Sequence, residues 1–117
     1  MIAARNYHAG LAAESSVLRR YLDAGYQLLA QRFRGLRGEI DLVLSKGAAV
    51  IFVEVKKSRS FESALARLGP AQIGRIFDTA SEFLGTQPMG QMTETRFDVA
   101  LVNAQGQVSV MENALGP

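Results

Sequence analysis

Two carboxylates and a lysine stand in two segments that read as neighbouring strands. Asp41 ends the string Gly-Glu-Ile-Asp, and Glu54 and Lys56 stand two residues apart in Val-Glu-Val-Lys. Alternation puts Glu54 and Lys56 on one face of their strand, and opposite side chains of adjacent strands lie about 5 Å apart. We therefore expect Asp41 and Glu54 to converge near one point, with Lys56 beside them.

Two carboxylates that close repel each other and raise each other's proton affinity unless a cation lies between them. A divalent ion removes this penalty, so the pattern indicates an oxygen-ligand site for Mg²⁺ or Mn²⁺. Lys56 could hold a water molecule there and stabilise charge that develops on a phosphate. The alternative is that the three residues form surface ion pairs on exposed strands, worth about 0–1 kcal/mol each.

A third carboxylate could reach the same place from a helix. Glu14 lies within the apolar stripe that carries Leu11 and Leu18, at helical spacing from both. A carboxylate facing the sheet is costly to bury unless it is paired or bound to a metal. Glu14 could instead reach solvent at the edge of the stripe, or pair with Arg19 or Arg32.

A polar residue near the start of a second helical segment could point into the same cleft. Gln72 precedes Ile76, a residue of that segment's apolar stripe, by four positions. Taken singly, a buried glutamine more often bonds a backbone carbonyl. On the fourth strand Asp98 alternates in register with Arg96, and we expect these two to form an ion pair.

The elements that position these residues follow from apolar spacing and from Gly and Pro. The pattern predicts helices over 10–24 and from Pro70 to Gly85, and a short helical turn could form over 63–68. It predicts strands over 26–34, 39–44, 49–56, 96–102 and 108–111. The first helix should bury Leu11, Leu18 and Leu22. Residues 50–53 are apolar on both faces, as in a central strand.

The second strand alternates between polar and apolar residues. The alternation should place Glu39, Asp41 and Val43 on one face of the strand. Ile40, Leu42 and Leu44 should lie on the other face. The element order α-β-β-β-α-β-β predicts an α/β fold in which helices flank a sheet of mixed direction. The chain of 117 residues should form a single domain, with residues 1–8 flexible or loosely packed.

Composition excludes several classes of chemistry. Apolar residues make up 48% and charged residues 21%, as in ordinary globular proteins. The chain has no cysteine and one histidine, which excludes disulfide frameworks, cysteine nucleophiles and His-rich zinc sites. The net charge is only +2, but residues 32–59 hold seven basic and three acidic residues. This local excess of positive charge favours a polyanionic partner, and the alternative is a solvated strand edge.

Nothing in the sequence indicates export or membrane insertion. The first residues lack a sustained apolar run, and the longest uncharged apolar stretch, residues 47–53, is far shorter than the roughly 20 residues of a membrane helix. We expect a cytoplasmic protein with no membrane partner.

These residues also match a known pattern. Glu14 on a first helix, Asp41, Glu54 and Lys56 together resemble the Asp…Glu-x-Lys nuclease superfamily. The whole chain resembles more closely the YraN-like family of uncharacterised bacterial proteins, which is related to archaeal Holliday-junction resolvases. The resemblance spans residues 10–115 and rests on these strings: GYQLL (25–29), GEIDLV (38–43), IFVEVK (51–56), RFDVALV (96–102) and ENAL (112–115).

The resemblance implies a restriction-endonuclease-like fold with its site on the hairpin. It implies that Asp41 and Glu54 bind Mg²⁺, that Lys56 assists the attacking water, and that Glu14 completes the metal site. Glu39 belongs to the family string, with either a supporting or a ligating role. The sequence departs from the family pattern at two places. Lys57-Ser58-Arg59 follows the Glu-x-Lys motif, and Gln72 occupies a position where a basic residue is expected.

We therefore expect a Mg²⁺- or Mn²⁺-dependent endonuclease that hydrolyses phosphodiester bonds in DNA. Structured or branched DNA is the expected substrate because no base-reading motif is visible. The residues expected to contact nucleic acid are Arg32, Arg34, Arg37, Lys57, Arg59 and Gln72. A homodimer is expected by analogy with the resolvases. The alternative is a catalytically silent nucleic-acid- or protein-binding module with the same fold.

Overall fold

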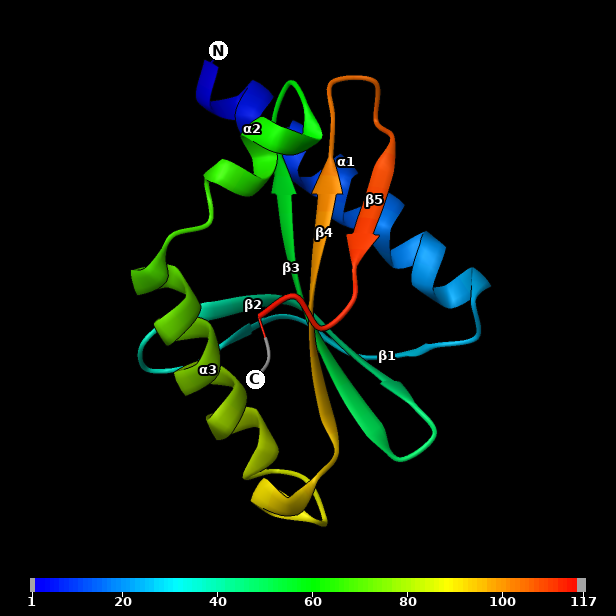
Figure 1. Ribbon diagram of the computed structural model, residues 1–117, viewed down its shortest axis with the longest axis vertical. Coiled ribbons are helices and arrows are strands. Elements are labelled where there is room, and N and C mark those ends of the chain that lie inside the picture. The colour runs from blue at the N-terminus through cyan, green and yellow to red at the C-terminus, as the bar shows by residue number, and fades with distance from the viewer. Residues whose placement is uncertain (1, 116–117) are drawn as a thin grey trace.

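A computed structural model describes residues 2–115, with side chains from Gly10 onward. Its elements in chain order are α1 (Ile2–Asp23), β1 (Gln27–Arg34), β2 (Glu39–Lys46), β3 (Ala49–Lys57), α2 (Phe61–Ala66), α3 (Pro70–Leu84), the 3-10 helix η1 (Gly90–Met92), β4 (Thr95–Val102) and β5 (Val108–Met111) (Figure 1). The predicted α/β class and element order are confirmed, and α2 forms where a helical turn could be expected.

The five strands form one sheet in the order β1-β2-β3-β4-β5. Strands β3 and β4 are parallel, and every other neighbouring pair is antiparallel. The predicted mixed direction and the central place of residues 50–53 are therefore confirmed. A parallel pair needs a long crossover, and the segment that contains α2 and α3 supplies it.

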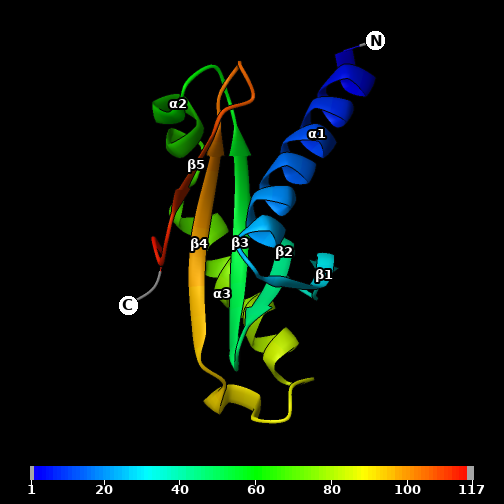
Figure 2. The ribbon, with the colours of Figure 1, turned by 90° about the vertical axis from the view of Figure 1, so that its right-hand side faces the viewer.

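Helices cover both faces of the sheet (Figure 2). Helix α1 packs on one face through Ala13, Val17 and Tyr21. Helix α3 packs on the other face, where the Phe83 ring contacts the rings of Phe33 and Phe52 edge-on. Helix α2 lies on the same face as α3, against β4. The sheet is thus the middle layer of three.

The buried stripe of α1 differs from the predicted one. Ala13, Val17 and Tyr21 are the buried residues, whereas Leu18 packs only partly and Leu22 is 44% exposed. The expected Leu11–Leu18–Leu22 face is therefore wrong. The angle at which a helix crosses the sheet decides which of its residues are covered. Here the small side chain of Ala13 allows close approach, and the Tyr21 hydroxyl donates a hydrogen bond to the buried Asp98.

Strand β2 departs from regular alternation near the site. Leu42 and Leu44 face α1 as a pair, but Ile40 joins Val43 in the cluster beneath α3. The prediction that Ile40 shares a face with Leu42 is therefore wrong. The paired residues of β2 and β3 run from Lys46–Ala49 to Leu42–Val53, so the change of face falls where β2 leaves β3.

The N-terminal segment is described in part. Its backbone is helical from Ile2, so α1 begins earlier than the predicted start at residue 10. The prediction that residues 1–8 pack loosely concerns Met1 and side chains that lie outside the described part of the chain. Among the described residues, no helix is long and apolar enough to cross a membrane.

Candidate active site

Asp41 lies where the ladder between β2 and β3 ends. The Val55 backbone N–H donates a hydrogen bond of 2.8 Å to Asp41 Oδ2. In a continued ladder this donor would face a backbone carbonyl of β2, and here the side chain takes that place. The short acidic side chain of Asp41 thus has two roles. It satisfies the backbone N–H of Val55, and it brings a carboxylate beside Glu54.

Glu54 is buried on the α3 face, and its two oxygens have different surroundings. Gln72 Nε2 on α3 donates to Glu54 Oε2 over 2.5 Å, and Lys56 Nζ lies 3.3 Å from the same oxygen. Glu54 Oε1 is buried with no hydrogen-bond partner in the part of the chain that the structure describes. One oxygen is thus held in place, and the other remains available.

Burial and mutual repulsion disfavour the charges of the two carboxylates. Burial is the largest cause that raises the pKa of Glu54 to about 8, followed by the charge of Asp41. Burial also raises the pKa of Asp41, and the charge of Glu14 adds to the rise, while the Val55 N–H opposes it. Two adjacent carboxylates therefore keep a proton that they would lose in water.

These features fit a divalent cation of the hard, oxygen-binding kind. A cation placed against Asp41 and Glu54 would satisfy Glu54 Oε1, which has no partner among the described residues, and would offset the burial that raises both pKa values. Among the described residues, however, no three or more acidic or histidine side chains are grouped so that they could hold a metal ion. The structure thus brings together two of the three predicted carboxylate ligands.

Glu14, the third predicted ligand, is engaged by an arginine. Arg32 on β1 donates to both of its oxygens, from Nε at 3.1 Å and from Nη2 at 3.2 Å. Of the alternatives open from sequence, pairing with Arg32 is the one found. The Arg32 backbone has φ of 51°, a left-handed conformation that is uncommon outside glycine. A left-handed residue in a strand is not visible in the sequence pattern.

An open groove of about 490 Å³ lies beside these residues. Its lining includes Glu14 from α1, Lys56 and Lys57 from β3, and Arg67 after α2. Arg67 Nη1 also donates to the Lys57 carbonyl over 2.6 Å. Sequence reasoning missed Arg67 as a site residue, although its position directly after a short helical segment beside a basic stretch is a signal that could have found it.

The other predicted nucleic-acid contacts are more scattered. Arg59 is exposed in the turn between β3 and α2. Arg34 pairs with Glu39 at 3.2 Å, and Arg37 lies 3.6 Å from Asp78 on α3. Glu39 is thus an exposed partner of an arginine. Gln72 contacts Glu54, so its position in the structure is that of a carboxylate holder.

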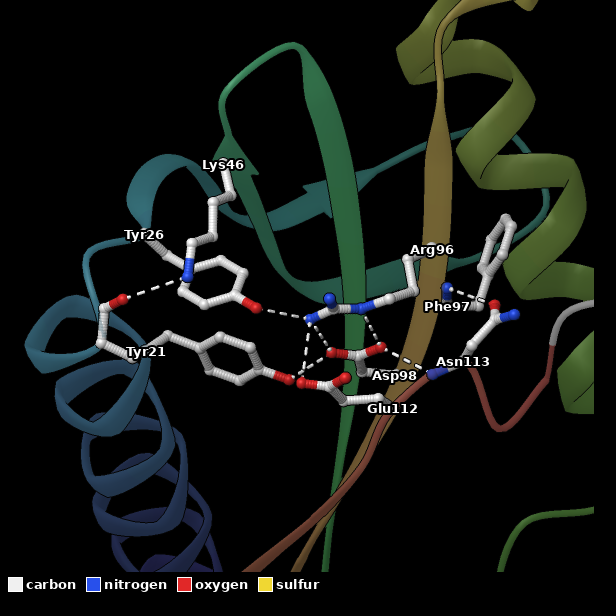
Figure 3. Close-up of polar contacts among 9 residues, drawn as sticks. Tyr21, Tyr26, Lys46, Arg96, Phe97, Asp98, Glu112 and Asn113 are labelled. Atoms are coloured by element: carbon white, nitrogen blue, oxygen red, sulfur yellow. Dashed lines mark hydrogen bonds and ion pairs between the residues drawn. The ribbon is translucent and has the colours of Figure 1, made fainter.

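A second polar cluster lies on the opposite face of the sheet, against α1. The Arg96 guanidinium pairs with the fully buried Asp98 at 2.9 Å, and the Tyr21 hydroxyl donates to Asp98 over 2.7 Å (Figure 3). Arg96 also donates to the Tyr26 hydroxyl. The expected Arg96–Asp98 pair is therefore present. Both Asp98 oxygens accept hydrogen bonds, Oδ1 from Arg96 Nε and the Asn113 N–H and Oδ2 from Arg96 Nη2 and the Tyr21 hydroxyl, as in a structural network.

Comparison with known proteins places this chain in a family. Residues 13–102 match the model of the uncharacterised protein family UPF0102, and the chain belongs to that family. A UPF0102 protein of Roseobacter denitrificans is 59% identical over 93% of this chain and 84% of its own length. One from Ruegeria pomeroyi is 52% identical over 96% of this chain and 91% of its own length. The expected YraN-like membership is thus confirmed.

Proposed function

We propose that this protein is a Mg²⁺- or Mn²⁺-dependent endonuclease that hydrolyses phosphodiester bonds in DNA, with structured or branched DNA as the preferred substrate. The observation that carries the proposal is the buried Glu54 beside the half-buried Asp41, with one Glu54 oxygen unpartnered among the described residues and Lys56 alongside. A structural ion pair has no need of a buried oxygen without a partner, whereas a cation site does.

Each side chain has a distinct task in this proposal. A bound Mg²⁺ would supply Lewis-acid chemistry and an acidified water. Asp41 and Glu54 would hold the ion, and Gln72 would fix the orientation of Glu54 through Oε2. Lys56, whose side chain is 14% exposed, would lie next to the attacked phosphate and stabilise the negative charge that develops there.

The groove offers cations for the substrate backbone. Lys57 and Arg67 line it, and exposed Arg59 follows Lys57 by two residues. Contacts to phosphate position a nucleic acid without reading its bases, which agrees with a preference for DNA shape over sequence. The proposed homodimer, cytoplasmic location and phosphate contacts of Arg34 and Arg37 are part of the same proposal.

A second candidate is a nucleic-acid-binding module without catalysis. The observation that favours it is the engagement of Glu14 by Arg32, which leaves two carboxylates at the site. Such a module would use the same basic groove and bind DNA without any effect of divalent ions.

One experiment separates the two candidates. Mg²⁺ and Mn²⁺ are titrated into the wild type and into the Asp41→Asn/Glu54→Gln double variant, with metal affinity followed by calorimetry. Cleavage of single-stranded, duplex and four-way-junction DNA is followed in the same samples. Asp23→Asn/Glu94→Gln is the matched control, because it removes two exposed carboxylates that do not line the groove.

The nuclease proposal expects metal binding and cleavage in the wild type and the control, and neither in the double variant. Metal binding without cleavage of any of these DNAs would support the cation site and contradict the proposed substrate. A wild type that binds DNA but no metal would overturn the nuclease proposal in favour of the binding module.

A further inference from the structure

The Arg32–Glu14 contact links the part of the site that would meet a metal to a part that would meet DNA. Arg32 holds Glu14 through two nitrogens, and the two side chains come from β1 and α1. The Arg32 side chain is 36% exposed and that of Glu14 is 14% exposed. A ligand from solvent can therefore approach the guanidinium more easily than the carboxylate.

Glu14 lies in the groove beside the proposed metal position. It lines the same groove as Lys56, which contacts Glu54. Its charge also acts on Asp41, since it is one of the causes that raise the pKa of Asp41.

The chemistry of the guanidinium indicates which ligand can take Glu14's place. Its planar fork matches a carboxylate and a phosphate equally well, with two parallel hydrogen bonds to either. A DNA phosphate that reaches the exposed part of Arg32 from solvent can therefore exchange with Glu14 at little cost in hydrogen bonds. The released carboxylate, no longer neutralised by Arg32, then adds its negative charge to that of Asp41, and this favours a cation beside them.

From these contacts we infer that Arg32 is a positioning residue that withholds Glu14 from the metal site until a DNA phosphate takes its place. Metal binding and DNA binding then assist each other, because each favours the state in which Arg32 and Glu14 are apart. Such coupling is reciprocal by thermodynamic necessity. This inference rests on the proposed function, since it assigns regulation to the same site.

The test measures Mn²⁺ affinity by calorimetry, with and without a four-way-junction DNA whose phosphorothioate linkages resist hydrolysis. In the wild type the DNA should tighten Mn²⁺ binding by roughly 5- to 150-fold, the usual range of such couplings. Arg32→Gln should bind Mn²⁺ more tightly than the wild type without DNA, and DNA should add little. Arg32→Lys keeps the charge but lacks the fork, so it should lie between the two.

A double-variant cycle with Glu14→Gln separates release of a ligand from loss of a nearby positive charge. If Arg32 acts by holding Glu14, then Arg32→Gln has no effect on Mn²⁺ affinity in the Glu14→Gln background. Circular dichroism checks that each variant is folded. An Arg32→Gln effect of equal size in both backgrounds would overturn the inference, as would wild-type Mn²⁺ affinity that DNA leaves unchanged.

The failure of this inference is distinguishable from failure of the proposed function. Mn²⁺ binding at Asp41 and Glu54 that ignores both DNA and Arg32 would remove the coupling and leave the nuclease proposal standing. Absence of Mn²⁺ binding in every variant, with and without DNA, would remove both.

Discussion

At the scale of single residues, Glu54 is the most informative side chain of this protein. It is almost fully buried, yet one of its oxygens has two polar neighbours and the other has none among the described residues. Burying a carboxylate disfavours its charged form unless something compensates. The metal-free protein therefore carries a local energetic penalty that a bound cation would relieve.

This penalty predicts how stability depends on pH. The pKa of Glu54 is raised to about 8 in the fold, above the ordinary value of 4.5 that applies to the unfolded chain. A raised pKa stabilises the fold below the unfolded value, and this contribution is lost as the pH rises toward the folded value. The metal-free protein should lose thermal stability between about pH 5 and pH 8, which thermal melts in a chelator would measure.

The control for this prediction is Glu54→Gln, which keeps the shape and the contact with Gln72 but cannot ionise. Its melting temperature should change less across the same pH range. At pH 8 it should exceed that of the wild type by about 4 °C or more, the shift that about 1 kcal/mol gives a small domain. Parallel pH profiles for the two proteins would contradict the assignment of the penalty to Glu54.

Asp41 carries a structural duty that can be separated from its proposed role in metal binding. Asparagine can still accept the Val55 N–H through its amide oxygen, whereas alanine leaves that donor without a partner. We expect Asp41→Asn to cost less than about 1 kcal/mol of stability and Asp41→Ala about 1–3 kcal/mol. Both should lose Mg²⁺ binding in calorimetry. Urea denaturation of the two variants gives the comparison, and equal stabilities would argue against the strand contact.

At the scale of elements, the parting of β2 from β3 creates the site. The ladder ends at Leu42–Val53, and β3 continues beside β4 to Lys57. The end of the ladder leaves the Val55 N–H to Asp41. Groups from both helical layers act there: Glu14 of α1 on Asp41, and Gln72 of α3 on Glu54.

Much of this arrangement could be predicted from sequence, because it depends on local rules. Alternation and the short turn of the hairpin were enough to bring Asp41, Glu54 and Lys56 into one region. The change of face between Ile40 and Leu42 could not be predicted, because it arises where a partner strand is lost. The residue types of β2 and β3 do not indicate at which residue the hydrogen bonding between the two strands ends.

The choice of partner for Glu14 depends on geometry that a sequence does not contain. Spacing left Arg19, Arg32 and solvent as alternatives, and in the fold it is Arg32, a residue with a left-handed backbone, that pairs with Glu14. The buried stripe of α1 was misplaced for a related reason. The angle at which a helix crosses a sheet decides which residues are covered, so apolar spacing alone favoured Leu22 over Tyr21.

The attachment of α1 to the sheet gives a prediction at this scale. Tyr21 connects the helix to the fully buried Asp98, which Arg96 also holds. Tyr21→Phe removes one hydrogen bond to a charged group and should cost about 1.5–3 kcal/mol. Urea denaturation measures the loss. Tyr26→Phe is the matched control, since its hydroxyl only accepts from Arg96 at a half-buried position, and it should cost less.

At the scale of the whole molecule, charge is distributed unevenly. The net charge of +2 conceals the basic excess of residues 32–59, and the groove gathers Lys56, Lys57 and Arg67. Part of that excess is neutralised within the fold, because Arg32, Arg34 and Arg37 all lie beside carboxylates. The cations best placed to meet a phosphate backbone are therefore those that follow the Glu-x-Lys.

This distribution predicts a salt-dependent affinity for DNA. Each phosphate contact contributes about 0.9 to the slope of log affinity against log salt concentration. We expect Lys57→Ala/Arg59→Ala to lower the slope by about 1–2 and to weaken binding to duplex and four-way-junction DNA alike. Arg19→Ala, an exposed arginine of α1, should leave the slope unchanged. Fluorescence anisotropy across a salt series measures both, and equal slopes for all three proteins would contradict this prediction.

The single parallel strand pair has a consequence for the order in which the molecule folds. The β2–β3 hairpin, which carries Asp41 and Glu54, closes a short loop, whereas β3 meets β4 only across the segment that holds α2 and α3. Long loops close slowly, so we expect the hairpin to form early and β4 to dock late. The two carboxylates thus approach each other while still hydrated. The free-energy cost of removing water from them then arises in the last folding step. A cation that binds them should therefore slow unfolding of the finished molecule more than it speeds folding.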